Sequence, residues 1–141
     1  MPALSPQEIS FFDQRASTAR NRAGRALAQN AFNVNSINQG GLLQREQIRS
    51  QYGPARGALA RSAAGRGILN SGVYRRDLNR LRGDELNAYR GLELGLADRL
   101  GRVGLSNLDI EGQLADELES VERERLARQA YLASIIQEGL V

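Results

Sequence analysis

The sequence predicts an all-α protein, an elongated helical bundle or hairpin with a long C-terminal helix. Apolar residues recur at steps of three and four along most of the 141 residues, as one face of an α-helix requires. Serines that suit N-cap positions precede two of these periodic stretches. A chain of this length fits one domain, residues 1–141. Only 5% of the residues are aromatic, so a core of Leu and Ala buries little area per residue, which favours assembly with other chains.

The first expected helix covers residues 6–31. Ser5 is its N-cap, and the Glu8 side chain reaches back to cap the same turn. The stripe behind it is mostly Ala, so a partner helix can approach closely but gains little area. Residues 32–41 are rich in Asn and Ser and close with two glycines, which predicts a loop.

A second helix is expected over residues 42–66, with a kink or a new start at Pro54, because proline lacks the N–H donor and restricts the residue before it. Residues 65–72 form a Gly-rich corner with Ser71 as the next N-cap. A structural turn between two helices is the main interpretation. A backbone nest for an anion is the alternative use of this corner.

Residues 73–138 are expected to form one long helix or a broken one. Four apolar residues stand 11 apart, at Leu81, Leu92, Val103 and Leu114, a spacing that favours a nearly straight helix over a left-handed coiled coil. Glycines and a capping signal at Ser106 favour a break near residues 101–106. The helix-packing interface is expected at Leu92, Leu96, Leu100, Leu114, Leu118 and Val121.

The composition excludes most catalytic chemistry. The sequence contains no His, no Cys and no Lys, so it lacks the residues for the common nucleophile pairs, for thiolate or imidazole metal sites and for a Schiff base. We therefore expect no enzyme, no catalytic or metal-binding residue, no cofactor and no small-molecule substrate. The sequence contains no stretch of 18 apolar residues, so we expect no membrane span, and it shows no signal-peptide pattern near the N-terminus.

An acidic cluster near the C-terminus contains Asp116, Glu117, Glu119, Glu122 and Glu124. Carboxylates could ligate a divalent metal. However, Glu119 and Glu124 each precede an arginine by four residues, Arg123 and Arg128, and such pairs stabilise a solvated helix face. The solvated face is the preferred interpretation.

The two halves of the chain carry opposite charge. Residues 1–76 contain 11 Arg and 3 acids, whereas residues 77–141 contain 8 Arg and 13 acids. The basic half predicts contact with an acidic protein surface, including the acidic half of a neighbouring copy, or with nucleic-acid phosphates. The candidate contacts are Arg45, Arg49, Arg56, Arg61, Arg66, Arg75 and Arg76.

Three stretches, residues 43–52, 60–72 and 74–78, resemble the small helical virion proteins of tailed bacteriophages. In these proteins an Ala-, Gln- and Arg-rich helix meets a corner like Gly67-Ile-Leu-Asn-Ser-Gly72 and a second charged helix. The resemblance covers about residues 40–130. It implies a homo-oligomeric structural part of the particle, a head-to-tail adaptor on the portal, a tail component or an internal protein ejected with the DNA. The implied location is the virion, and the host cytoplasm during assembly.

Two other functions stay open at this point. The Arg-rich half could bind DNA in a nucleic-acid-binding or DNA-ejection protein. An amphipathic, membrane-active protein released during DNA entry is a third hypothesis.

Overall fold

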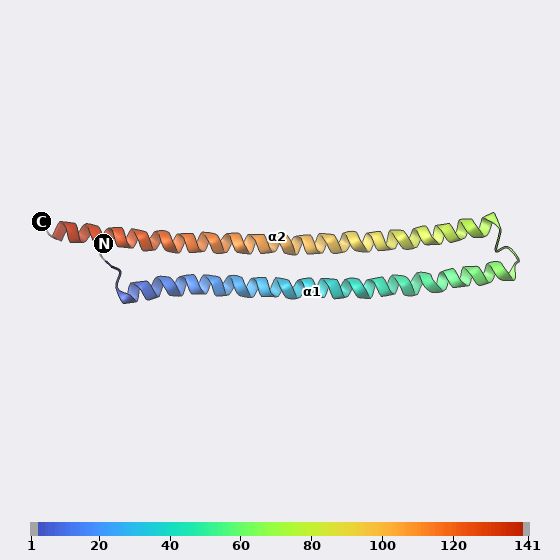
Figure 1. Cartoon of the computed structure of the whole chain (residues 1–141), viewed down its shortest axis with the longest axis horizontal. Helices are drawn as coiled ribbons and strands as arrows, with labels where there is room; N and C mark the ends of the chain where they lie inside the picture. The colour runs from blue at the N-terminus through green and yellow to red at the C-terminus, as the bar shows by residue number, and fades with distance from the viewer. Residues whose placement is uncertain (1–2, 140–141) are drawn as a thin grey trace. The chain divides into compact units, whose positions relative to one another are not determined.

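The computed structural model describes residues 3–139. Two α-helices, α1 (Pro6–Gly65) and α2 (Gly72–Gly139), account for nearly all of these residues, and the described range holds no strand. The chain follows α1, reverses once at residues 66–71 and returns along α2, which packs against α1 (Figure 1). The predicted all-α class, the helical hairpin and the long C-terminal helix are confirmed.

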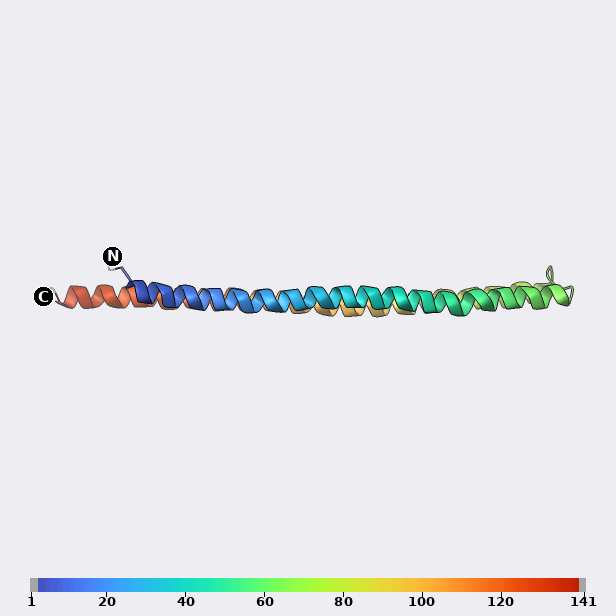
Figure 2. The ribbon, with the colours of Figure 1, turned by 90° about the horizontal axis from the view of Figure 1, so that it is seen from below.

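The chain divides into two compact units, which are described separately. The terminal unit combines Met1–Phe32 with Gly104–Val141, and the turn unit is Asn33–Val103. In each unit a stretch of α1 lies beside an antiparallel stretch of α2, as both ribbon views show (Figures 1 and 2). The single domain over residues 1–141 stays a prediction, since both helices run through both units.

The start of α1 is capped as predicted. The Glu8 backbone N–H donates to Ser5 Oγ at 3.2 Å, and the Glu8 carboxylate accepts the Ser5 backbone N–H at 3.0 Å. These reciprocal bonds form a capping box, which satisfies donors that the first helical turn leaves without partners. Just before the cap, Leu4 is buried in a small apolar cluster with Phe12 and Val121. The terminal unit therefore has its core beside the first turns of α1.

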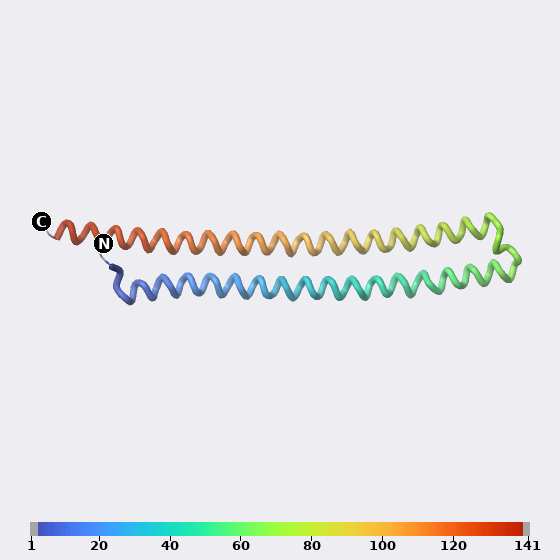
Figure 3. The backbone as a smooth tube through the Cα atoms, viewed as in Figure 1, coloured from blue at the N-terminus to red at the C-terminus, as the bar shows by residue number. Residues whose placement is uncertain are grey.

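The reversal at residues 66–71 is a compact helix end (Figure 3). Gly67 has a positive φ of 66°, and the N–H of Ile68 donates to the Ala63 carbonyl at 2.9 Å, the pattern of a Schellman motif. A glycine suits this position because its φ value strains other residues. The next helix begins with Ser71 Oγ accepting the Tyr74 N–H at 3.2 Å. The predicted corner at 65–72 and its N-cap are thus confirmed.

The predicted loop at residues 32–41 is wrong, because α1 continues through this segment without a break. Val34, Ile37 and Gly41 are spaced by three and four, and they are half-buried or buried, so they extend the packing stripe of the preceding turns. The Leu96 side chain lies so close to Gly41 that a Cβ there would stand 2.8 Å from Leu96 Cδ1. Tertiary packing thus outweighs the weak helix propensity of Asn, Ser and Gly.

The predicted break near residues 101–106 is also wrong, because α2 is continuous from Gly72 to Gly139. Ser106 does not cap a new helix. Its hydroxyl accepts a hydrogen bond from Asn30 Nδ2 at 3.0 Å, and Asn107 Oδ1 accepts another at 2.8 Å. The polar residues that suggested a helix start instead form an interhelix contact between α2 and α1.

Pro54 does not start a new helix, since it lies inside α1. Its exposed position lets water bind the backbone carbonyl that the missing N–H leaves without a helical donor. Proline is therefore tolerated here on the solvent side of the helix.

The 11-residue spacing identifies the side of α2 that faces α1. Leu81, Leu92, Val103 and Leu114 are all half-buried, whereas most of their chain neighbours are exposed. A repeat of 11 residues corresponds to about 3.67 residues per turn, so these positions stay on one side of an α-helix with little supercoiling.

Candidate interaction surface

All seven candidate arginines lie in the turn unit, but their surroundings differ. Arg56 forms an ion pair across the helices with Glu85. Arg49 pairs along α1 with Glu46 at 3.1 Å, and Arg66 donates to the hydroxyl of the serine four residues before it at 3.1 Å. The remaining four, Arg45, Arg61, Arg75 and Arg76, are exposed and have no ion pair among the described residues.

The Arg56–Glu85 pair is the most sheltered ion pair in the described part of the chain. The Glu85 side chain is 15% exposed and that of Arg56 is 38% exposed. Here the basic half of the chain meets an acid of its own C-terminal half. Arg56 is therefore paired within the turn unit, with part of its side chain still in contact with solvent.

The end of the turn unit near the reversal is strongly basic. Residues 56–82 contain seven arginines and one acid, Asp77. Arg61 lies in the last turns of α1, Arg66 lies just beyond its end, and Arg75 and Arg76 lie in the first turns of α2. The exposed guanidinium groups thus give this end a positive potential.

The six expected packing positions lie on the side of α2 that faces α1. Leu96 packs on Gly41 in the turn unit, and Val121 is buried beside Phe12 in the terminal unit. The others, Leu92, Leu100, Leu114 and Leu118, are half-buried. Packing within the chain therefore uses these side chains.

Three ion pairs that the sequence analysis missed join the helices of the terminal unit. Arg15 pairs with Glu124, Arg22 with Glu117 at 3.1 Å, and Arg128 with Glu8 at 2.7 Å. The signal was present, since Arg15 and Arg22 flank the Ala stripe of α1 and the acids flank the stripe of α2. It could be recognised only once the two stripes were paired in an antiparallel hairpin.

The prediction that the acidic cluster forms a solvated helix face is partly wrong. Glu119 does pair with Arg123 at 2.8 Å, as expected. Glu124 and Arg128, however, each pair with α1 rather than with one another. Part of the acidic cluster thus joins two helices instead of only meeting solvent.

The interhelix pairs shift the titration of their members. The hydrogen bond from Arg128, followed by the bonds from Ser5, holds the pKa of Glu8 below its usual value. The hydrogen bond from Arg15 likewise lowers the pKa of Glu124, and the bond to Glu124 raises the pKa of Arg15. In each case bonding to the charged form favours that form.

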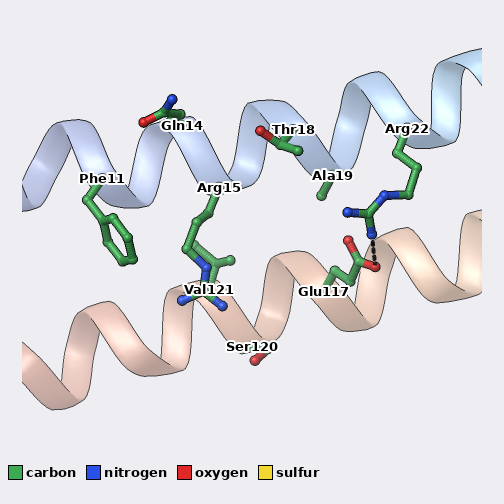
Figure 4. A pocket seen from close by; sticks show the side chains of 9 residues that line it. All are labelled: Phe11, Gln14, Arg15, Thr18, Ala19, Arg22, Glu117, Ser120 and Val121. Carbon is green, nitrogen blue, oxygen red and sulfur yellow. Dashed lines mark hydrogen bonds and ion pairs between the residues drawn. The ribbon is translucent and has the colours of Figure 1, made fainter.

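A shallow groove of about 440 Å³ runs between the helices of the terminal unit (Figure 4). Phe11 and Arg15 line one part of it, with the Arg15 guanidinium 5.7 Å from the centroid of the Phe11 ring. Arg22 and Glu117 line another part, joined by the ion pair drawn in Figure 4. Each charged side chain that lines the groove is thus in an ion pair, Arg22 with Glu117 inside the lining and Arg15 with Glu124 beside it.

Large apolar side chains are exposed on the outer sides of both helices. In the turn unit Leu43 is 67% and Leu94 is 72% exposed. Each lies two residues from the contact between Gly41 and Leu96, and two residues turn a helix by about 200°. Leu43 and Leu94 therefore point away from the hairpin interior on opposite sides.

The terminal unit, taken by itself, repeats this arrangement. Phe32 is 65% and Leu105 is 64% exposed, and each lies two residues from the hydrogen bond between Asn30 and Asn107. Their outward direction follows from the same helix geometry.

Among residues 3–139, no group of three or more acidic side chains is placed to hold a metal ion. Neither helix contains a stretch apolar enough to cross a membrane within that range. No model of a known protein family matches the chain, and no curated protein or solved structure shows significant similarity to it.

Proposed function

We propose that this chain is a non-enzymatic structural subunit that assembles with copies of itself. One observation carries the proposal. In the described part of the chain six apolar residues are buried, while fifteen large apolar side chains remain exposed. Two helices side by side bury only the stripes that face each other, so most of the apolar surface of this hairpin needs further helices to cover it.

We assign the assembly to the particle of a tailed bacteriophage, as a head-to-tail adaptor on the portal or as a tail component. The resemblance of residues 40–130 to virion proteins supports this assignment. Its partners are then further copies and other virion proteins, and its location is the virion after assembly in the host cytoplasm. Nothing in the paired acids or the open groove of the terminal unit calls for catalysis.

Light scattering behind a sizing column, at low and high salt, tests the self-assembly. We expect a species well above the 15.5 kDa monomer that persists at high salt, because apolar burial is not screened by ions. A monomer that unfolds cooperatively at both salt concentrations would overturn the proposal. Electron microscopy of the large species then reports whether it forms rings, as an adaptor requires.

A second function, binding of nucleic acid, is favoured by one observation, the exposed arginines at the basic end of the turn unit. Replacing Arg61, Arg66, Arg75 and Arg76 with Gln should abolish retention of duplex DNA, because each lost phosphate contact no longer releases counterions. A matched control removes the same charge from α2 by replacing Arg99, Arg102, Arg123 and Arg125 with Gln. Equal loss in both variants would argue for net charge alone and against a site at the turn.

A further inference from the structure

We propose that the outer side of α1 in the turn unit docks against the outer side of α2 in the turn unit of a second copy, with Leu43 against Leu94. This inference rests on the proposed self-assembly and specifies the surface that carries it. The outer face of α1 consists of Gln39, Leu43 and Glu46, and that of α2 of Arg90, Leu94 and Asp98. All six residues are exposed. Two of them are leucines; Glu46, Arg90 and Asp98 are charged, and Gln39 is polar and neutral.

The two leucines lie at the same level along the hairpin. Gly41 and Leu96 are in contact, and both Leu43 and Leu94 are two residues closer to the reversal than that contact. Because the rise per residue is the same in both helices, a second copy beside the first needs no shift along the helix axis to bring Leu43 onto Leu94.

The flanking charges match in the same arrangement. Glu46 lies three residues beyond Leu43 toward the reversal, and Arg90 lies four residues from Leu94 in that direction. Glu46 of one copy therefore faces Arg90 of the next. Arg90 has no ion pair within residues 3–139, and Glu46 is held only by the exposed pair with Arg49, which contributes little and can be shared.

The opposite end of the contact brings no repulsion. Asp98 lies on the far side of Leu94 and faces the neutral Gln39, and it keeps its own pair with Arg102 at 3.0 Å. Docking in this direction therefore places one opposite-charge pair beside one apolar pair in each contact.

A different dimer would pair α2 with α2 about a twofold axis at Leu94, bringing Arg90 against Asp98 twice. That contact covers Leu94 but leaves Leu43 exposed. The arrangement proposed here covers both, because every copy offers the α1 face on one side and the α2 face on the other. Such a head-to-tail contact repeats, and it closes into a ring or extends into a filament.

Single cysteines identify the contact directly, because the chain has no cysteine of its own. The variants Leu43→Cys and Leu94→Cys, carrying tags of different size, are mixed and treated with a short bis-maleimide. We expect a cross-linked pair between the two variants and none from either variant alone. The control is Leu126→Cys, exposed at 54% in the terminal unit, which should give no defined pair with either variant.

The outcomes separate this inference from the proposed function. Oligomers that form without a cross-link between positions 43 and 94, or with Leu94→Cys linked to itself, overturn the docking mode and leave self-assembly intact. A chain that stays monomeric overturns both. Circular dichroism of each variant verifies that the helices are retained.

Reversing the charges gives an independent test at low salt. Glu46→Arg alone and Arg90→Glu alone should each weaken association by about tenfold, whereas the double variant restores the pair between copies and recovers most of the affinity. The control Glu119→Arg makes the same charge change on an exposed part of the terminal unit and should leave association unchanged. A double variant no better than either single one would contradict the proposed contact.

Discussion

Arg56 on α1 forms an ion pair with Glu85 on α2, and Glu85 is the least exposed charged side chain of any described ion pair, at 15%. It links the basic and acidic halves of the sequence within one hairpin. The partial burial of Glu85 strengthens such a contact, because less water screens the two charges than at an exposed pair.

Removing Glu85 should therefore destabilise the chain more than removing an exposed acid. We expect Glu85→Ala to lower the free energy of unfolding by about 1–2 kcal/mol, and Glu119→Ala, which breaks an exposed pair along α2, to lower it by about 0.3 kcal/mol. Urea titration followed by circular dichroism measures both. Equal losses would mean that the sheltered pair contributes no more than a surface pair.

Two adjacent glycines provide a matched test of helix packing. Gly40 has open space where a Cβ would lie, whereas at Gly41 a Cβ would meet Leu96. Gly40→Ala should stabilise the chain by about 1 kcal/mol through helix propensity. Gly41→Ala should gain less or nothing, because Leu96 has to move. Thermal unfolding of the two variants decides this, and equal stabilisation would show that Leu96 shifts freely.

The hydrogen bond between Asn30 and Asn107 is predicted to set the register of the terminal unit rather than to add stability. Asn107→Leu alone leaves Asn30 with one acceptor fewer and should cost about 1–3 kcal/mol. The double variant with Asn30→Leu should recover most of that loss, because two apolar groups can face each other without a polar penalty and only the half-buried Ser106 hydroxyl loses a donor. Urea titration of the single and double variants completes the cycle. A double variant less stable than the single one would refute this role.

Acid should weaken the terminal unit. The arginine and serine partners of Glu8 and Glu124 lower the pKa values of both carboxyl groups. The two carboxylates therefore stabilise the folded unit fully above the ordinary carboxyl pKa of 4.5, and this stabilisation is lost as the pH falls through the lowered pKa values. Hydrogen exchange of residues 6–32 at pH values between 2 and 6 should show this loss of protection. The double variant Glu8→Gln and Glu124→Gln should show a smaller dependence on pH over that range. The same dependence in both proteins would exclude these two carboxylates as its cause.

The outcome for individual residues shows what a single sequence can predict. Ser5 with Glu8, and Ser71 before α2, were recognised because a cap depends on neighbours within four residues along the chain. Ser106 gave the same local signal and was misread, because its partner, Asn30, lies on the other helix. The Asn- and Gly-rich segment 32–41 was misread for a similar reason, since what keeps it helical is the packing of Leu96 on Gly41.

For the candidate contact residues, the sequence predicted where the arginines lie but not which acids they pair with. Composition alone located the basic half, and the exposed arginines at the turn follow from it. It gave no means to foresee that Arg56 pairs with Glu85, or that Arg15 and Arg22 pair with acids of α2. Those partners lie between 29 and 109 residues away in the sequence.

By itself, then, the sequence determined the helical class, the caps, the reversal at 65–72 and the side of each helix that packs, because these depend on residue type and on spacings of three, four and eleven. The tertiary structure decided that α1 and α2 run unbroken, which charges pair, and which apolar residues stay outside. Those outcomes depend on how one helix aligns with the other. That alignment is a free-energy balance over many contacts distant in sequence, and no local pattern contains it.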